Sequence, residues 1–316
     1  MVRLTNLKKE DFKSILENYE IGEYKSDKHI WQALENTVYE LRTTNGKYIV
    51  KISEKSKPSF LRYQIKIINF LKEKGLPVQE YIKTKSGKYI FFYKHKNILI
   101  NKFIEGKIDV KLDKDLVIDI AHKLGLLNKY LLKIKLTGKY TWGKDYQFKP
   151  LRERAGIIGK FNFTKEEKKL LKDMKKLKRN KLRKSLIHGD FHPSNFVIKN
   201  NKLVGIMDWD DMREDFLVCE VSLFIVHSLA SKNLDEEKIK LFLKEYQKIV
   251  KLNNEEKKAS YYLMKNNCLM TIAWCEIQQR THKDNSKKIQ RWETNIIKEY
   301  FDISRMSLES FLEFFD

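Results

Sequence analysis

The stretch SLIHGDFHPSNFVIKNNKLVGIMDWDD, residues 185–211, carries an acid, an amide and a second acid at set intervals. Asn195 follows Asp190 after a gap of four residues, and an apolar run, Leu203 to Met207, leads to Asp208. An acid can accept or orient the proton of an attacking hydroxyl, and an amide and a second acid supply the hard oxygen ligands that magnesium prefers. The residues therefore predict a magnesium-dependent phosphoryl-transfer site and a kinase of small molecules.

The same stretch also predicts a local fold. Two short apolar strands, Phe196 to Ile198 and Leu203 to Met207, flank the pair Asn200-Asn201, which indicates a hairpin. This hairpin would bring Asn195 and Asp208 together. An ordinary loop also uses Asp and Asn as turn residues, but it does not require a second acid at the end of the following strand. The gap before Asn195 matches the protein-kinase pattern H-R-D-x-x-x-x-N.

The composition suits a chain with two lobes. At 316 residues the chain is long for one compact core, and its 42% of hydrophobic residues can build two. No stretch has the apolar length of a membrane span, and MVRLTNLKKEDF lacks a signal-peptide core, so we expect no membrane partner and a cytoplasmic location. The three cysteines are too few and too far apart for a disulfide framework or a zinc site, and we interpret them as packing residues: Cys219, Cys268 and Cys275.

The formal net charge is +22, from 64 Lys and Arg against 42 Asp and Glu. Such an excess indicates either nucleic-acid binding or a lysine-rich surface. The densest run, KKLKRNKLRK at residues 175–184, is interpreted as a solvated helix end, because no nucleic-acid motif accompanies it. Nucleic acid is therefore not expected as a partner, whereas attraction of ATP and other anionic ligands is.

The first hundred residues predict a small mixed lobe of five strands and one helix. Alternating residues on both sides of Asn45-Gly46 indicate a hairpin with a type I′ turn. A helix is expected from Pro58 to Lys74, with a proline in its first turn and Gly75 after its end. The strands with a clear pattern are residues 37–43, 47–52, 88–93 and 97–103.

Lys51 lies in the second of these strands, within the apolar sequence YIVKI. A lysine that is buried without a partner costs several kcal/mol or loses its proton. Lys51 either points to solvent on the polar face of the strand or meets a negative ligand. Because it precedes a D-x-x-x-x-N pattern, we interpret it as a nucleotide-phosphate contact.

After residue 105 the apolar pattern becomes helical. One stripe is formed by Leu116, Ile120, Leu124, Leu127 and Leu131. Thr164 and Glu167 predict a capping box for a helix that runs toward Leu177. We therefore expect an α+β fold with two lobes. Residues 1–104 would bind the nucleotide on an antiparallel sheet with one main helix, and residues 105–316 would form a larger, mostly helical lobe for catalysis and the acceptor.

Several motifs together resemble those of a known family. HGDFHPSN is similar to the family motif H-G-D-L-H-P-G-N, and IMDWDD is similar to I-D-F-D-D. ENTVYELRTTNGKYIVKI resembles the family's first hairpin, and EKGLPV and FIEG resemble the stretches that follow the lobe helix and reach the hinge. Nearly the whole chain thus resembles the aminoglycoside phosphotransferases and their relatives, which include choline kinases, homoserine kinases and methylthioribose kinases. The resemblance implies a protein-kinase-like fold and a hydroxyl of a small molecule as the acceptor.

The resemblance also implies roles for individual residues. Asp190 would be the catalytic base, Asn195 and Asp208 the magnesium ligands, and Lys51 the contact to the α- and β-phosphates of ATP, with GTP as a second candidate nucleotide. Asp210 would either reach a second metal ion or cap the turn. The other nucleotide-binding candidates are the backbone amides of Asn36 and Thr37, the adenine-binding segment with Ile100, Lys102 and Phe103, and Gln64.

Gln64 departs from the pattern, because the family usually has a glutamate there that pairs with the nucleotide lysine. An amide can accept a hydrogen bond but cannot neutralise Lys51. The alternative to an active kinase is therefore a catalytically silent member of the fold that binds nucleotide or has a structural role.

The sequence leaves the acceptor open between an amino alcohol, an amino acid such as homoserine, a sugar and an aminoglycoside, and it leaves the oligomeric state open. Aromatic residues either line the acceptor site or pack in the core: Tyr140, Trp142, Trp209, Trp274 and Trp292. Three acids are candidates for a cationic acceptor, and the last of them is also a candidate brace of the catalytic loop: Glu214, Asp215 and Glu220.

Overall fold

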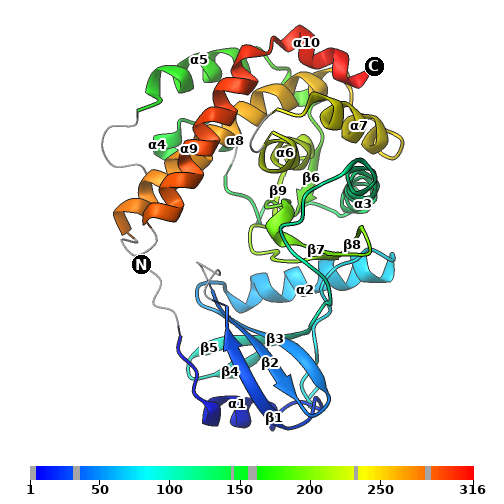
Figure 1. Cartoon of the computed structure of the whole chain (residues 1–316), viewed down its shortest axis with the longest axis vertical. Coiled ribbons are helices and arrows are strands. Elements are labelled where there is room, and N and C mark those ends of the chain that lie inside the picture. The colour runs from blue at the N-terminus through cyan, green and yellow to red at the C-terminus, as the bar shows by residue number, and fades with distance from the viewer. Residues whose placement is uncertain (1–4, 31–35, 144–145, 156–161, 231–233, 282–285) are drawn as a thin grey trace. The chain divides into compact units, whose positions relative to one another are not determined.

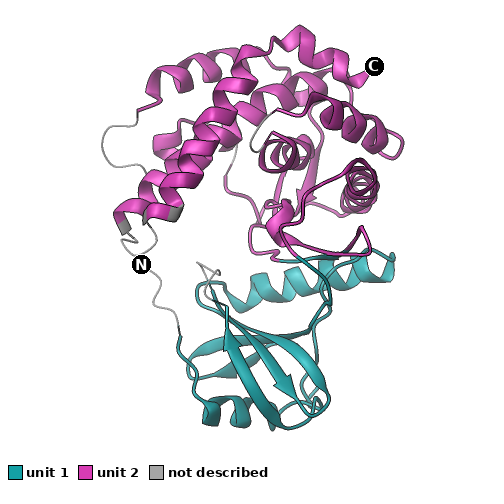
Figure 2. Cartoon of the chain, in the orientation of Figure 1, with its two compact units in different colours: residues 1–107, 204–207 teal, residues 108–203, 208–316 magenta. Residues whose placement is uncertain are grey.

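The computed structural model describes residues 5–30, 36–143, 146–155, 162–230, 234–281 and 286–316. Contacts within the chain define two compact units, which Figure 2 shows in separate colours. Unit 1 comprises Met1–Lys107 and Val204–Met207, and unit 2 comprises Ile108–Leu203 and Asp208–Asp316. In the described part of the chain, no helix is both long and apolar enough to cross a membrane.

Unit 1 is built on one antiparallel sheet of five strands in the order β1-β2-β3-β5-β4 (Figure 1). The strands are β1 (Tyr24–His29), β2 (Thr37–Thr43), β3 (Gly46–Ser53), β4 (Phe91–Tyr93) and β5 (Lys96–Lys102). One face of the sheet packs its buried residues, among them Leu41, Val50 and Ile52, against Phe12 and Ile15 of helix α1 (Lys9–Leu16). The segment Val204–Met207 joins this unit through a bridge between Val78 and Ile206.

Helix α2 (Pro58–Glu73) confirms the helix predicted at this place. Pro58 occupies its first turn, where a missing N–H costs no hydrogen bond, and Gly75 follows its end with a φ of 78°. Leu61, Ile68 and Leu71 lie on one face and have no exposed surface. Burial of each such side chain contributes about 1.5–3 kcal/mol, so packing of this face holds the helix in place.

Three expectations for local structure in unit 1 are wrong. A second helix, α1, is present. The sequence did not reveal it because its eight residues give only a short apolar pattern. The predicted strand from Lys88 starts only at Phe91. The hairpin turn before Lys47 is not of type I′, because Thr43 pairs with Gly46 and the two residues between them do not have positive φ angles.

Unit 2 contains most of the helices. They are α3 (Lys114–Leu131), α4 (Leu151–Ala155), α5 (Thr164–Met174), α6 (Val218–Phe224), the π-helical turn η4 (Ile225–Leu229), α7 (Glu236–Gln247), α8 (Asn254–Thr281), α9 (Ser286–Arg305) and α10 (Leu308–Leu312). Helices α8 and α9 lie side by side (Figure 1). The leucine and isoleucine stripe predicted for residues 116–131 is fully buried on α3. The predicted α+β fold class, with a small sheet-based unit and a larger helical unit, is confirmed.

The capping box predicted for α5 does not form. The N-terminal cap position is Phe163, and no side chain caps the helix there. The Glu167 carboxylate instead accepts a hydrogen bond from the backbone N–H of Leu151, at the start of α4. The Glu167 side chain therefore makes a tertiary hydrogen bond to α4 instead of capping α5.

The remaining strands carry the catalytic stretch, and they lie in unit 2 except for residues 204–206, which belong to unit 1. They are β6 (Lys184–Ile187), which pairs with β9 (Arg213–Phe216), and β7 (Phe196–Lys199), which pairs with β8 (Lys202–Ile206). Asn200 and Asn201 form the β7–β8 turn with φ angles of 50° and 57°. Positive φ at both central residues is the requirement of a type I′ turn, so the predicted hairpin is confirmed.

Candidate active site

The catalytic loop begins where β6 ends. Gly189 has a φ of 87°, and a Cβ at this position would overlap the Asp211 carbonyl oxygen and the Arg213 guanidinium. Only glycine meets both conditions without strain. The tight passage at Gly189 sets the direction in which the next residue, Asp190, leaves the strand.

Glu220 of α6 holds the loop from beneath. Its two carboxylate oxygens accept hydrogen bonds from the backbone N–H groups of His188 and Gly189, each at 2.9 Å, and it has no exposed surface. Burial raises the pKa of Glu220 to about 7, against the opposing effect of these two N–H groups. Glu220 therefore braces the loop and is not a ligand for a cationic acceptor.

The Asp190 carboxylate is oriented by two neighbours on the same loop. Asn195 Nδ2 donates to its Oδ2 at 2.8 Å and to the Asp190 carbonyl at 2.9 Å, and His192 Nε2 lies 3.2 Å from the same Oδ2. Burial favours the neutral acid, but the hydrogen bond with His192 and the charges of the nearby histidines hold the pKa of Asp190 well below its usual range. Asp190 is therefore an ionised carboxylate held in a fixed orientation.

The metal candidates lie at both ends of the β7–β8 hairpin. Asn195 ends the short 3-10 helix η3 (Pro193–Asn195), and both hydrogen bonds to Asp190 use its nitrogen, so its Oδ1 points elsewhere. Asp208 is exposed and has a φ of 53°, and Asp210 is half-buried. In the part of the chain that the structure describes, no three His, Cys, Asp or Glu side chains form a metal cluster. Magnesium commonly takes only one or two protein carboxylates and completes its shell with phosphates and water, so this donor set fits it.

Sequence reasoning missed Arg213, which is almost fully buried on β9. Its Nη1 donates to the carbonyl oxygens of Gly189 and Asp211, and its Nε donates to Asp215 at 3.1 Å. It joins the catalytic loop to the segment after Asp208. A single arginine among acids in DDMRED was the available signal, but only the fold shows which carbonyls it reaches.

The residues considered for the acceptor separate into two groups. Trp209 is fully buried against His188, with ring centres 4.5 Å apart, and Trp274 packs on Trp292 at 5.3 Å between α8 and α9. Trp142 is 45% exposed, and the guanidinium carbon of Arg213 lies 3.6 Å from the centre of its ring. Of these four tryptophans, only Trp142 combines exposure with a contact to the catalytic segment.

The acids proposed for a cationic acceptor already have partners. Glu214 accepts hydrogen bonds from the backbone N–H groups of Thr137 and Gly138 and from the Thr137 hydroxyl. Asp215 accepts from Gln147 Nε2 at 2.7 Å and from Arg213. Together with the bracing role of Glu220, these contacts show that the acids hold loops in place.

In unit 1, Lys51 lies in the middle of the sheet, where it pairs across with Val38 of β2 and Leu99 of β5. Gln64 of α2 is fully buried, and its side-chain oxygen accepts a hydrogen bond from the Tyr81 hydroxyl at 3.3 Å. Gln64 is thus part of a buried hydrogen-bond network that includes Tyr81.

The other nucleotide candidates also have partners within unit 1. Asn36 Oδ1 accepts from the Glu54 backbone N–H, and the Thr37 hydroxyl donates to the Glu54 carboxylate at 2.7 Å. Ile100 is fully buried in β5. The backbone N–H of Lys102 donates to the carbonyl oxygen of residue 80, and that of Phe103 donates to the carbonyl oxygen of residue 47. An adenine would therefore meet this segment at other backbone groups than these two donors.

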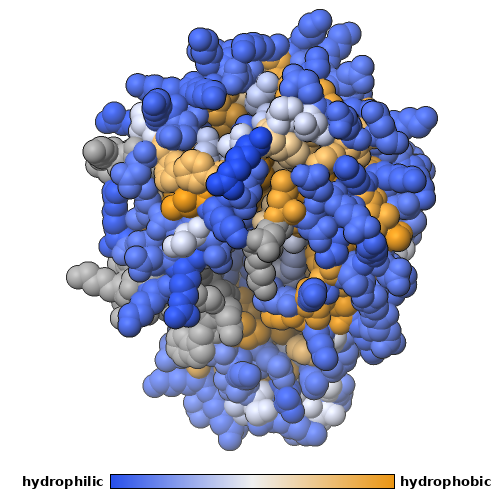
Figure 3. Space-filling view, turned by 45° about the horizontal axis from the view of Figure 1, so that its top comes forward, coloured by the Kyte–Doolittle hydropathy of each residue, from blue (hydrophilic) through white to orange (hydrophobic). Residues whose placement is uncertain are grey.

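The basic run at residues 175–184 is partly neutralised. Arg183 forms an ion pair with the buried Glu256 at 2.7 Å, Lys176 pairs with Asp173 at 2.7 Å, and Arg179 lies 4.1 Å from the centre of the Phe148 ring. Figure 3 shows hydrophilic residues over most of the visible face, with apolar residues in small separate patches.

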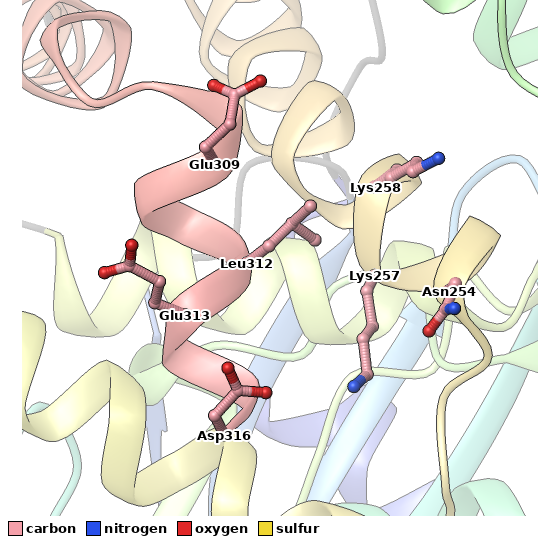
Figure 4. Close-up of a pocket in the computed structure, with 7 residues that line it drawn as sticks. All are labelled: Asn254, Lys257, Lys258, Glu309, Leu312, Glu313 and Asp316. Carbon is pink, nitrogen blue, oxygen red and sulfur yellow. The ribbon is translucent and has the colours of Figure 1, made fainter.

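A hollow of about 460 Å³ lies on unit 2 between α10 and the first turn of α8 (Figure 4). Lys257 and Lys258 line one side, and Glu309, Glu313 and Asp316 line the other. Leu312 points between the two sides. The lining carries charges of both signs, two lysines and three carboxylates, and none of its residues belongs to the catalytic loop.

The fold and the loop together define a class of protein. A sheet-based unit with a strand lysine, a helical unit, and the ordered set Asp190, Asn195 and Asp208 are the parts of a protein-kinase-like phosphotransferase. The profile of the phosphotransferase enzyme family matches residues 28–251, and the chain belongs to this family. It is a small-molecule phosphotransferase.

Individual proteins support the same placement. The homoserine kinase of Zymomonas mobilis subsp. mobilis is 24% identical over 290 residues, which cover 87% of this chain and 89% of that protein. The solved structure of amicoumacin kinase hAmiN with AMP-PNP, Ca2+ and Ami has a TM-score of 0.71 at 16% identity, covering 94% of this chain and 93% of that one. A microcompartment-associated aminopropanol kinase has a TM-score of 0.72 at 13% identity, covering 96% and 98%. The family resemblance and the protein-kinase-like fold predicted from the sequence are confirmed.

Proposed function

We propose that the chain transfers the γ-phosphoryl group of ATP, with Mg2+, to a hydroxyl of a small amino acid or amino alcohol. The observation that carries this proposal is the geometry of Asp190, whose carboxylate is fixed by Asn195 and His192 on a loop that Glu220 braces. The acceptor class is supported by the relatives, which are named as homoserine and aminopropanol kinases.

In the proposed reaction Asp190 orients the acceptor hydroxyl and takes its proton. The hydroxyl oxygen forms a bond to the γ-phosphorus while the bond from that phosphorus to the bridging oxygen breaks, and ADP leaves with the bonding electrons. The proton on Asp190 then passes to solvent. Because the carboxylate is already held by two hydrogen bonds, little reorganisation is needed when the hydroxyl arrives.

Nucleotide binding is assigned to residues 1–104 and catalysis to residues 105–316. Lys51 would contact the α- and β-phosphates, and Asn195 Oδ1 and Asp208 would hold Mg2+, with Asp210 as a further candidate. Bound Mg2+ would neutralise charge on the phosphate oxygens. The complex of a similar structure with AMP-PNP supports ATP as the nucleotide, with GTP as the alternative.

The test is an ADP-release assay of the wild type, Asp190→Ala and Asp208→Ala with a panel of amino acids, amino alcohols, sugars and aminoglycosides. Asp173→Ala is the matched control, because Asp173 lies on α5, outside the site, and forms an ion pair with the exposed Lys176. We expect both site variants to lose at least 10²-fold in kcat with an unchanged melting temperature, and the control to keep its activity. Full turnover by either site variant contradicts the assignment. Stabilisation of the wild type by ATP and Mg2+ without ADP release from any acceptor supports the silent alternative.

A further inference from the structure

Arg154, near the end of α4, is a cation whose guanidinium uses only some of its hydrogen-bond donors. Its Nη2 donates to Asn266 Oδ1 at 2.7 Å, and its guanidinium lies 5.5 Å from the centre of the Tyr146 ring. Its Nε and Nη1 are buried and have no hydrogen-bond partner among the described residues. Burial lowers the pKa of Arg154 to about 10, so the side chain is still charged near neutral pH.

A continuous set of contacts joins Arg154 to the catalytic loop. Tyr146 packs edge-on against Trp142, with ring centres 4.9 Å apart. Trp142 in turn lies over Arg213, whose Nη1 donates to the carbonyl oxygen of Gly189. Since Gly189 precedes Asp190 in the chain, the two aromatic rings and the buried Arg213 connect Arg154 to the catalytic loop.

A second, polar route joins the same two ends. Asn266 Nδ2 donates to Gln147 Oε1 at 2.9 Å, and Gln147 Nε2 donates to Asp215, which also accepts from Arg213. Every side-chain amide in this route is therefore oriented by its neighbours. The route fixes the position of Arg154 without using its Nε and Nη1.

The carboxylates of this region are not available to Arg154 in the described structure. Asp215 is shared by Arg213 and Gln147, Glu214 is held by backbone N–H groups of the segment at residues 137–138, and Glu167 accepts from the Leu151 N–H. A buried donor without an acceptor is costly, and a charged donor more so. Among the described residues, Arg154 thus keeps two unused donors, while the carboxylates of Asp215, Glu214 and Glu167 are each held by other groups.

We propose that Arg154 binds a carboxylate of the acceptor, so that the preferred acceptor is a hydroxylated amino acid rather than an amino alcohol. This inference rests on the proposed kinase function and narrows its acceptor class. The oxygens of a carboxylate accept hydrogen bonds from guanidinium N–H groups, and such charge-assisted bonds are stronger than neutral ones. Arg154 acts on acceptor affinity, while Asp190 and the metal ligands act on the transfer step.

The experiment uses pairs of acceptors that differ by one carboxylate. The pairs are L-homoserine and 3-amino-1-propanol, L-threonine and 1-amino-2-propanol, and L-serine and ethanolamine. Wild type, Arg154→Gln, Arg154→Lys and Arg152→Gln are compared by ADP release. Arg152 is the matched control, because it lies on the same short helix and is exposed. Melting temperatures and circular dichroism spectra establish that each variant is folded.

We expect the wild type to have the lower KM for the amino acid of at least one pair. Arg154→Gln should raise that KM by about 10- to 100-fold with little change in the KM for ATP, since a hydrogen bond to a charged group is lost. Arg154→Lys, which keeps the charge, should restore part of the affinity. Arg152→Gln should behave as the wild type, and the amino alcohols should not distinguish the variants.

A wild type that prefers the amino alcohols, or an Arg154→Gln variant that affects both members of a pair equally, overturns the carboxylate site but leaves the kinase function standing. If no acceptor releases ADP, the kinase function fails, and thermal stabilisation by the same amino acids decides the carboxylate site. Stabilisation of wild type and Arg152→Gln but not of Arg154→Gln supports the site, and stabilisation of none of them overturns it.

Discussion

Replacement of Glu299 by glutamine should make the protein more resistant to unfolding at alkaline pH. Glu299 lies on α9 with 3% of its surface exposed, and its Oε2 has no hydrogen-bond partner among the described residues. Burial, together with the negative charge of Asp302, raises the pKa of Glu299 from 4.5 to about 8. The native protein therefore keeps the proton on this side chain at neutral pH.

The size of the effect follows from the two pKa values. As the pH rises above 4.5, the unfolded chain loses the proton of Glu299 first, while the native protein keeps it until about pH 8. Stability is thus fully present at acidic pH and declines through this window. At about 1.4 kcal/mol for each pH unit, the decline reaches roughly 5 kcal/mol at most. Glutamine cannot ionise, so the variant should match the wild type near pH 5 and be more stable above about pH 8.

The assay is urea unfolding of wild type and Glu299→Gln, followed by circular dichroism, across the range from about pH 5 to about pH 9. Glu293→Gln is the control, because Glu293 lies on the same helix, is half-buried and accepts a hydrogen bond from Gln279. The control should keep the pH dependence of the wild type. Parallel stability curves for wild type and Glu299→Gln would refute the reasoning.

Three further predictions concern the site. Glu220→Ala leaves the backbone N–H groups of His188 and Gly189 without acceptors, so kcat measured by ADP release should fall by about tenfold or more, with the acceptor KM as the control. An unchanged kcat would show that the catalytic loop keeps its conformation without Glu220. Gly189→Ala forces a side chain into a φ of 87° and against the Asp211 carbonyl, so it should lower both melting temperature and activity; a stable, active variant would contradict the described loop. Gln64→Glu should tighten ATP binding, measured by calorimetry, because the new carboxylate is expected to pair with Lys51. A large drop in melting temperature together with weaker ATP binding would show that the buried acid has no partner.

Local sequence patterns predicted those parts of the fold that depend on near neighbours. The helix at Pro58 and the hairpin through Asn200 and Asn201 were found because a proline in a first turn and an Asn-Asn pair between apolar runs act within a few residues. The bracing role of Glu220 was open in the sequence, since an acid at that position also suits a cationic ligand. The structure decides it through two backbone hydrogen bonds.

The features that the sequence did not reveal depend on contacts between distant residues. Arg213 donates to a carbonyl oxygen 24 residues earlier, and Glu167 accepts from a backbone N–H group 16 residues earlier. No periodicity marks such pairs. Arg154 is one of the two arginines in the sequence RER, and only its burial beside Tyr146 separates it from the exposed Arg152. The roles proposed for Lys51 and the metal ligands stay predictions until the variants are measured.

The way in which Glu214 anchors its loop has a consequence for the evolution of specificity. Two of its three hydrogen bonds come from the main chain, at Thr137 and Gly138, and these donors persist when most side chains change. The neighbouring positions, including Trp142 and Tyr146, can therefore be diversified while the segment stays attached to β9. A library randomised at these positions should retain a large share of folded members, so the acceptor site proposed beside Arg154 can be varied without loss of the fold.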